Sequence, residues 1–341
     1  MMRRLYLLLF TTFTITTFLP AQDAALITPV AVDTVKNWIA GAALGMDFAQ
    51  LFQLNPRQGA GQNRVGFGGA TNFFAKYKKE RVAWDNLASW QVGLQRLGSG
   101  PIAQGTTVKI PFQKAIDELR LNSKVGYKTS ETSKFFYAAD FSFLSQVVPT
   151  YTDRGFPGNF PKALSDTSTL LSKFFAPATL TLSAGMDYKP NANLSIYYSP
   201  IGAKMIVVAN DEIAATGVHG NPVTKNAAGT IVDFKNVDMQ LGSLLRLGYA
   251  QKFFNDRMTY LSSLLLFSNY LQNTQNIDVD WTNELGLTIF RGLQLSVTAN
   301  VFYDDDIKVQ ITDYEAPNGV RGVGKRVSFT QQLLLKYNVV F

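Results

Sequence analysis

The sequence predicts an all-β protein, an antiparallel up-and-down transmembrane β-barrel of about twelve strands. Three observations lead to this prediction. The last sixteen residues alternate between apolar and polar side chains and end on Phe341. Eleven earlier segments also have the composition of strands, and several alternate in the same way. Short and long connections then alternate along the chain, as they do when tight turns lie on one side of a membrane and loops on the other.

The first residues have the features of a secretory signal peptide. Arg3 and Arg4 precede residues 5–19, which carry no charge, and Pro20-Ala21 leads into polar residues. A permanent transmembrane anchor is the alternative, but the uncharged stretch is shorter than the roughly 20 residues that a membrane-spanning helix needs. We therefore expect residues 1–21 to be a cleaved signal peptide.

The rest of the chain divides into a lead-in and the expected strands. We expect residues 22–37 to form a short periplasmic lead-in and residues 38–341 to form the barrel. An even number of strands places both ends of the barrel on one side of the membrane. The expected strands are residues 38–54, 63–78, 81–98, 114–130, 135–151, 179–190, 194–210, 238–255, 257–271, 277–290, 292–305 and 326–341.

Several of these segments have two chemically different faces. In the segment 292–305, Leu293, Leu295 and Val297 share one face, because side chains two residues apart point the same way in a strand. The opposite face is polar and carries Gln294, Ser296, Thr298 and Asn300. In the segment 194–210, Pro200 and Gly202 indicate a bend or a bulge.

Composition excludes several kinds of site. The 341 residues include no cysteine, so disulfides and thiolate metal sites are impossible, and the single histidine, His219, rules out a multi-histidine site. The 32 Lys and Arg residues outnumber the 25 Asp and Glu residues only modestly and are dispersed, so we expect no nucleic-acid partner. A mean hydropathy of +0.01 is too polar for a helical membrane protein but suits alternating strands.

A soluble β-sandwich or a larger soluble barrel is the alternative fold. The positions of the tyrosines favour the membrane barrel, because five of them fall near expected strand ends, where an interfacial aromatic belt would lie. These are Tyr127, Tyr188, Tyr249, Tyr270 and Tyr303. A closed barrel also pairs every backbone polar group without leaving an edge, as lipid requires.

The C-terminal segment predicts a location and a partner. A terminal strand that ends on an aromatic residue resembles the assembly signal of bacterial outer-membrane β-barrels. We therefore expect the protein to lie in the cell outer membrane, surrounded by its lipid. We also expect the barrel-assembly machinery to bind the strand that ends at Phe341. The sequence does not indicate another protein partner.

Several segments combine strand, turn and aromatic patterns in a recognisable order. They are Asn37-Trp38, Trp84-Asp85-Asn86, Val125-Gly126-Tyr127-Lys128, residues 177–190, Ser199-Pro200-Ile201-Gly202-Ala203-Lys204 and Val218-His219-Gly220. On these segments the chain resembles a family of uncharacterised outer-membrane β-barrels from Bacteroidota. The resemblance implies a location and an architecture, and it carries over no catalytic residue.

Charged side chains on the expected inner faces form the candidate site. Asp278, Asp280 and Glu284 share one face of the segment 277–290. They form either a cation-attracting strip in a pore or one side of an ion-pair network, and the narrow interior of a twelve-stranded barrel favours the network. All should face inward, because a charge facing lipid at the midplane costs roughly 2–4 kcal/mol. The candidate cationic residues of the lumen are Arg120, Lys124, Arg246, Arg326 and Lys336.

Three other features remain as weaker candidates. A hydrolase would need His219 beside a serine and a third orienting group, and the sequence fixes no serine there. The glycines at 66, 68 and 69 lead into a strand-like stretch, so they do not form a nucleotide-binding turn. Phe156 and Phe160, in the expected loop 152–178, either contact a partner or glycan or fold back to plug the barrel.

The sequence therefore supports three functions in order. A small passive channel or solute-uptake pore comes first, because small barrels with polar interiors often conduct. A non-conducting scaffold, receptor or accessory barrel of a secretion or assembly complex comes second, because Phe136, Phe302 and Leu334 on the inner faces would narrow a pore. A lipid hydrolase comes last. We expect no enzymatic activity, no cofactor and no metal.

Overall fold

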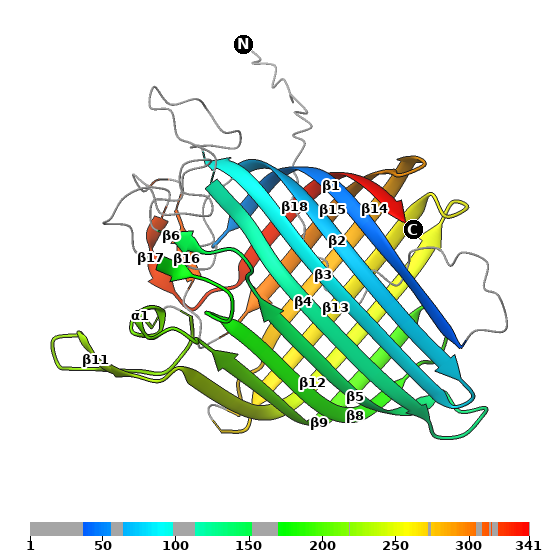
Figure 1. Cartoon of the computed structure of the whole chain (residues 1–341), viewed down its shortest axis with the longest axis horizontal. Coiled ribbons are helices and arrows are strands. Elements are labelled where there is room, and N and C mark those ends of the chain that lie inside the picture. Colours follow the sequence, from blue (N-terminus) through cyan, green and yellow to red (C-terminus); the bar gives the residue numbers. More distant parts are fainter. Residues whose placement is uncertain are drawn as a thin grey trace, which may run out of the picture.

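The computed structural model describes residues 37–55, 64–97, 113–151, 170–217, 219–271, 274–304, 309–313, 315 and 320–340. These residues form a closed antiparallel barrel of twelve strands, which confirms the predicted fold class (Figure 1). The barrel strands are β1 (Trp38–Leu54), β2 (Arg64–Lys79), β3 (Val82–Leu97), β4 (Gln113–Lys128), β5 (Phe135–Ser145), β8 (Ala178–Tyr188), β9 (Leu194–Val207), β12 (Val237–Phe253), β13 (Met258–Asn269), β14 (Asp278–Phe290), β15 (Leu293–Tyr303) and β18 (Ser328–Val340).

The barrel closes where its first strand meets its last. Strand β1 pairs with β18 from Ala43 opposite Val340 to Leu54 opposite Phe329, and with β2 on its other side. Each barrel strand therefore has two hydrogen-bonded neighbours, and the sheet has no edge. The start of β1 and the end of β18 lie at the same end of the barrel as the tight turns, as an even strand count requires (Figure 1).

The exposed face of the barrel is the apolar one. On β1, the outward side chains of Leu44, Met46 and Phe48 are 49%, 69% and 40% exposed. On β14, Trp281 is 42% exposed, whereas Glu284 on the opposite face is 5% exposed. A soluble sandwich would bury its apolar face, so this inverted pattern belongs to a surface that lipid covers.

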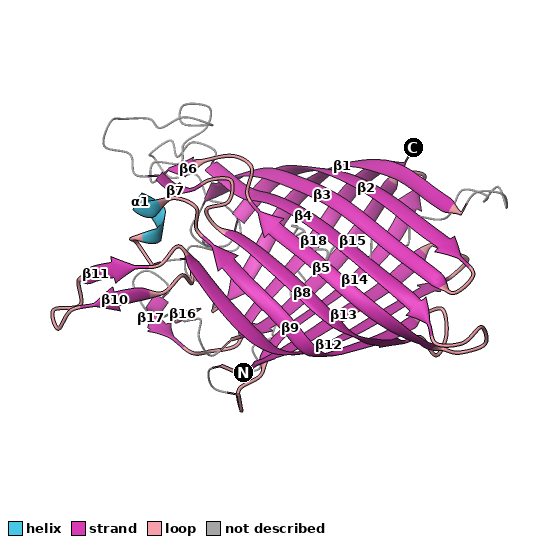
Figure 2. Ribbon diagram, turned by 60° about the horizontal axis from the view of Figure 1, so that its bottom comes forward, coloured by secondary structure: helices cyan, strands magenta, loops and turns pink. Residues whose placement is uncertain are grey.

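The two ends of the barrel differ. The tight turns at one end span two to six residues, between β2 and β3, β4 and β5, β8 and β9, β12 and β13, and β14 and β15. The other end carries short elements that the sequence did not predict (Figure 2). They are β6 (Thr150–Tyr151), β7 (Leu170–Ser172), α1 (Asp211–Ala214), β10 (Val223–Lys225), β11 (Ile231–Phe234), β16 (Val309–Thr312) and β17 (Val320–Gly324). None of the helical structure in the described ranges has the length and apolarity of a membrane-spanning helix.

Several expected strands extend beyond the observed ones, and two of these differences affect the candidate site. The segment 135–151 leaves the barrel after Ser145, because the Asp117 carboxylate accepts hydrogen bonds from the Val147 and Val148 amides at 3.1 and 2.6 Å. The segment 326–341 joins the sheet only at Ser328. Arg326 is therefore outside the strand on which the sequence placed it.

The bend predicted on the seventh strand is present in β9. The pairing register shifts on both sides of Pro200, toward β8 and toward β12. The bulge pushes the backbone of β9 toward its neighbour, so a Cβ atom at Gly185 of β8 would overlap the Tyr198 carbonyl oxygen. Gly185 is therefore a place where the fold requires the absence of a side chain.

We expect Gly185→Ala to destabilise the barrel by about 1–3 kcal/mol, because the clash is with backbone that cannot turn away. Gly248→Ala is the matched control, since a Cβ atom there meets nothing within 4 Å. Urea unfolding of the chain refolded into lipid vesicles, followed by tryptophan fluorescence, measures both. Equal stability of the two variants would contradict this description of the bulge.

Candidate functional site in the barrel lumen

Ion pairs between strands that are not neighbours in the sheet identify the inner wall of the barrel. Arg246 on β12 pairs with Asp140 on β5, although β8 and β9 lie between them. The strands β5 and β12 are three strand spacings apart, which is about 14 Å along the wall. Side chains diverge on the outside of a barrel and converge on its inside, so this pair lies in the lumen.

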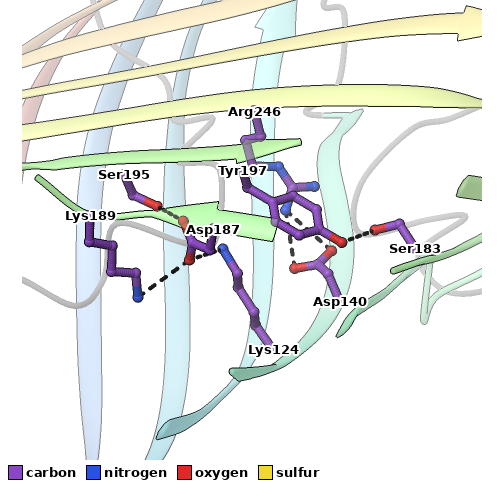
Figure 3. Close-up of polar contacts among 8 residues, drawn as sticks. All are labelled: Lys124, Asp140, Ser183, Asp187, Lys189, Ser195, Tyr197 and Arg246. Carbon is purple, nitrogen blue, oxygen red and sulfur yellow. Dashed lines mark hydrogen bonds and ion pairs between the residues drawn. The ribbon is translucent and has the colours of Figure 1, made fainter. Parts of the chain in front are cut away.

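Asp187 is the centre of one polar cluster (Figure 3). Its carboxylate is 1% exposed and lies 2.7 Å from the Lys124 ammonium and 3.4 Å from the Lys189 ammonium. The Ser195 hydroxyl donates a third bond to it, at 2.7 Å. The burial of this charge is therefore offset by two cations and a hydroxyl, as a buried carboxylate requires.

A second cluster lies beside the first and is joined to it by Tyr197 (Figure 3). Both carboxylate oxygens of Asp140 are 3.2 Å from Arg246 Nη1. The Tyr197 hydroxyl is 3.0 Å from the Ser183 hydroxyl, and the Lys124 ammonium lies 4.5 Å from the centre of the Tyr197 ring.

Apolar side chains continue this layer along the wall. Tyr197 packs with Ala138, Leu244 and Phe267, which are all less than 9% exposed. The side chains come from β5, β9, β12 and β13. One side of the lumen is thus covered by a layer of paired charges and packed apolar groups.

The wall formed by β14, β15 and β18 carries a separate pair. Lys336 and Glu284 lie 2.7 Å apart across the intervening strand β15, and both are buried. Next to them, Asn300 donates hydrogen bonds to Asp280 at 2.6 Å and to Thr282 at 2.8 Å. Four other buried polar atoms of this wall have no hydrogen-bond partner among the described residues: Glu284 Oε2, Ser296 Oγ, Thr298 Oγ1 and Gln332 Oε1.

The inner face of β1 and β2 is different because it is built from small residues. The polar side chains of Asp47 and Asn338 lie close to the backbone of two glycines on this wall. Cβ atoms at Gly68 and Gly45 would lie 2.7 Å from Asp47 Oδ2 and 2.6 Å from Asn338 Oδ1. The glycines leave room for these polar groups beside the backbone, which keeps them away from the centre of the lumen. The small inward residues are Gly41, Ala43, Gly45, Gly66, Gly68 and Ala70.

The cationic residues chosen from the sequence have different positions. Lys124, Arg246 and Lys336 each pair with a carboxylate inside the barrel. Arg120 pairs with Glu118, and Asp280 on the opposite wall is close enough to act electrostatically on its guanidinium.

Arg326 does not lie on a barrel strand, although the sequence predicted it on the inner face of the last strand. It is exposed in the link before β18 and donates to the Lys325 carbonyl.

The acids expected on β14 do not form one strip along a pathway. Glu284 is held by Lys336, and Asp280 by Asn300. Asp278 is half-buried at the start of the strand. The residues that complete the ion pairs, Asp140 and Asp187, were not chosen from the sequence, although both occupy the polar face of an alternating segment.

The structure also places the histidine and the glycine run that the sequence singled out. His219 is half-buried, and its Nε2 lies 2.8 Å from the Leu171 carbonyl oxygen of β7. The glycines at 66, 68 and 69 lie within β2, as expected. Phe156, Phe160, Phe341, the signal peptide and most of the lead-in lie outside the described residues. Within the described ranges, no group of three or more His, Cys, Asp or Glu residues is arranged to hold a metal ion.

Comparisons with known proteins give one family match and several similar solved structures. The family described as "Protein of unknown function (DUF3078)" matches residues 50–151. No curated protein matches the chain. Among solved structures, the COG4313 outer membrane channel from Pseudomonas putida F1 has 11% identity and a TM-score of 0.40. The alignment covers 91% of this chain and 100% of that one.

Two further structures show how varied the similar barrels are. The translocator domain of the autotransporter NalP from Neisseria meningitidis has 8% identity and a TM-score of 0.39, with 88% of each chain covered. The outer membrane phospholipase A from Escherichia coli has 10% identity and a TM-score of 0.34, with 87% and 92% covered. All three identities are far below 25%, so no role of these proteins transfers to this chain.

We expect Arg246→Ala to destabilise the barrel by about 3–5 kcal/mol, because it leaves the buried Asp140 carboxylate without its cation. Lys252→Ala removes a cation from an exposed pair with Asp256 and should cost no more than about 1 kcal/mol. Urea unfolding in lipid vesicles compares the two. The double variant Asp140→Asn/Arg246→Gln should recover part of the loss, and a single variant as stable as the control would show that the pair is not buried.

Proposed function

We propose that the protein is an outer-membrane channel with a narrow polar lumen, which passes small solutes passively. The observation that carries this proposal is the inner face of β1 and β2. Six inward positions there bear no side chain beyond a methyl group. We also propose that the barrel-assembly machinery inserts the chain through its C-terminal strand, β18.

The arrangement of the two walls supports a path along one side of the lumen. The charged and apolar layer covers the wall from β4 to β13, where it fills space. The small residues of β1 and β2 belong to the other side of the barrel, where their short side chains take up less of the lumen than Asn72 and Phe74 on the same face do. Asp47 and Asn338 supply polar groups beside that space, so water and small polar solutes meet hydrogen-bonding partners there.

Most of the lumen charges are paired, and this limits the solute class. Lys124, Arg246 and Lys336 each have a carboxylate partner at 2.7–3.2 Å. A lumen of paired charges has no large field of one sign, unlike a pore lined by a ring of unpaired acids or bases. The favoured cargo is therefore small and polar, with little preference for the sign of its charge.

Ala70→Trp tests the path directly. Ala70 faces the lumen within the small-residue wall, and Ala88 on the adjacent strand β3 faces lipid. We expect discrete conductance steps from the refolded chain in planar bilayers. A tryptophan at position 70 should lower the step size at least severalfold, because the indole fills the space that the small residues leave. The same substitution at Ala88 should leave it unchanged.

The outcomes separate the channel from its alternatives. A folded barrel that never conducts would contradict the proposal. Equal conductance of the native chain and the Ala70→Trp variant would contradict the path along β1 and β2. Heat-modifiable migration on a gel shows in each case that the variant is folded.

A non-conducting scaffold or receptor is the second candidate, and two observations favour it. Several inward side chains, including Leu334 and Ser199, are 0% exposed, so no water touches them in this conformation. The loop end also has a packed core of its own, made of Ala176, Val208 and Ile213 with Ala214. Such an ordered outer surface suits binding of a partner, which would remain with the purified barrel.

We propose a non-enzymatic role for the chain. A serine hydrolase uses an imidazole nitrogen to accept the serine proton. His219 Nε2 lies 2.8 Å from the Leu171 carbonyl oxygen, and among the described residues no hydrogen bond joins its ring to a serine. This contact fixes the ring against the loop-end sheet and gives it a structural role.

A further inference from the structure

The turn end of the barrel carries a collar of positive charge on its membrane side. Seven cations lie in the tight turns or directly beside them. Lys128 contacts the Glu131 carbonyl and Lys189 pairs with Asp187, and four of the other five are exposed. The same turns contain three acids, Glu80, Glu131 and Asp256, and the last of these pairs with Lys252. The five cations, which we call the basic collar, are Lys79, Arg81, Lys134, Arg257 and Arg291.

A belt of aromatic side chains lies directly below the basic collar. The belt faces outward, and many of its rings are between a third and two-thirds exposed. Such rings take positions at the level of lipid headgroups, where one side of the ring is apolar and the other is hydrated. The belt consists of Trp38, Tyr77, Trp84, Tyr127, Phe135, Tyr137, Tyr188, Tyr249, Phe253, Tyr260 and Tyr337.

The contacts of Arg81 fix the height and direction of the collar. Its guanidinium lies 4.6 Å from the centre of the Tyr127 ring and donates to the Lys128 carbonyl at 2.8 Å. Tyr127 is 47% exposed on the lipid-facing surface. The guanidinium is thus held at the outer surface of the wall, where a headgroup phosphate lies, and away from the lumen.

Neighbouring turns add further cations to the same place. The β2–β3 turn brings Lys79 and Arg81 together, and the adjacent β4–β5 turn brings Lys134. The loop end differs, because exposed acids such as Asp211 and Asp233 lie among its cations Lys225 and Lys235. Among the described residues the loop end also exposes Arg321, Lys325 and Arg326, so the collar is distinguished by its position beside the outward aromatic rings.

We infer that the basic collar binds anionic phospholipid headgroups of the adjacent leaflet, with the strongest contact between the β2–β3 and β4–β5 turns. Anionic lipid is the occupant because the cations lie above rings that face lipid. An acidic protein in the aqueous phase would approach the turns from their tips and would not reach the surface of Tyr127. This inference depends on the barrel spanning a membrane and is independent of whether the lumen conducts.

The chain contains its own reporters for the test. The rings of Trp38 and Trp84 meet edge to face in the belt, with their centres 5.6 Å apart, and Trp281 lies on β14 near the loop end. The full chain with Trp90→Phe and Trp281→Phe reports on the collar, and the chain with Trp38→Phe, Trp84→Phe and Trp90→Phe reports on the loop end. Each is refolded into vesicles that contain brominated phosphatidylglycerol or brominated phosphatidylcholine, and quenching of tryptophan fluorescence gives the relative lipid association.

We expect the collar reporters to show a preference for phosphatidylglycerol of about fivefold for each cation in contact with a headgroup. The Trp281 reporter should show none. High salt should reduce the preference, because it screens exposed charges. Lys79→Gln/Lys134→Gln, which spares the turn contacts of Arg81, should lower the preference at least several-fold. Lys225→Gln/Lys235→Gln removes the same charge from the loop end and should leave it unchanged.

Equal quenching of Trp38 and Trp84 by the two lipids, with all collar cations in place, would overturn the inference. It would instead favour an acidic protein as the partner of these cations. A preference that survives Lys79→Gln/Lys134→Gln unchanged would also overturn the assignment to these turns. Failure of the channel experiment would leave both results unaffected, so the two proposals fail separately.

Discussion

The structure depends on the hydrogen bonds that join β1 to β18. In a hydrocarbon environment an unpaired backbone group costs several kcal/mol, so a sheet with free edges cannot cross it. The seam removes both edges by pairing residues near the two ends of the barrel sequence, such as Leu44 and Val339. Once the sheet is closed, each side chain faces either lipid or the lumen, and the two-residue alternation of the sequence becomes the chemical difference between outside and inside.

The closed sheet also explains where the charges lie. Charges within the wall are driven inward by the cost of facing lipid, and twelve strands leave too little room for them to remain hydrated separately. They pair across intervening strands, as Arg246 does with Asp140 and Lys336 with Glu284. Charges at the turn end escape this constraint, because they lie at the headgroup level. The same physical rule thus produces a neutralised lumen and a positively charged collar.

The sequence predicted the strands well because lipid imposes a strict rule on them. All twelve barrel strands lie at or close to the expected positions, including β13, whose run of leucines hides its alternation. The bend at Pro200 was also predicted, because proline and glycine act locally. By contrast, the end of β5 is set by Asp117, which lies on the neighbouring strand, and the elements of the loop end are held by distant contacts such as that of His219 with Leu171. Local patterns carry no signal for these.

The site was predicted less completely than the fold. Alternation predicts which residues face inward, and Lys124, Arg246, Lys336 and Glu284, which were expected there, each form an ion pair with a residue on another strand. It does not show which inward residues meet, because partners across intervening strands depend on strand tilt and register. Asp187 therefore went unrecognised, although Lys124 lies 2.7 Å from it.

A disulfide between β1 and β18 tests the closure of the barrel most directly. The chain has no cysteine, so Leu44→Cys/Val339→Cys introduces a single pair at positions that face each other on β1 and β18. Directly opposed strand residues have Cα atoms about 4.5–5.5 Å apart, which a disulfide can bridge. Closure of the barrel through β1 and β18 predicts rapid oxidation of this pair in the folded, membrane-inserted chain, seen as a mobility shift on a gel. Leu44→Cys/Tyr337→Cys, displaced by two residues, should oxidise poorly. Failure of the first pair, or equal oxidation of both, would contradict closure of the barrel in this register.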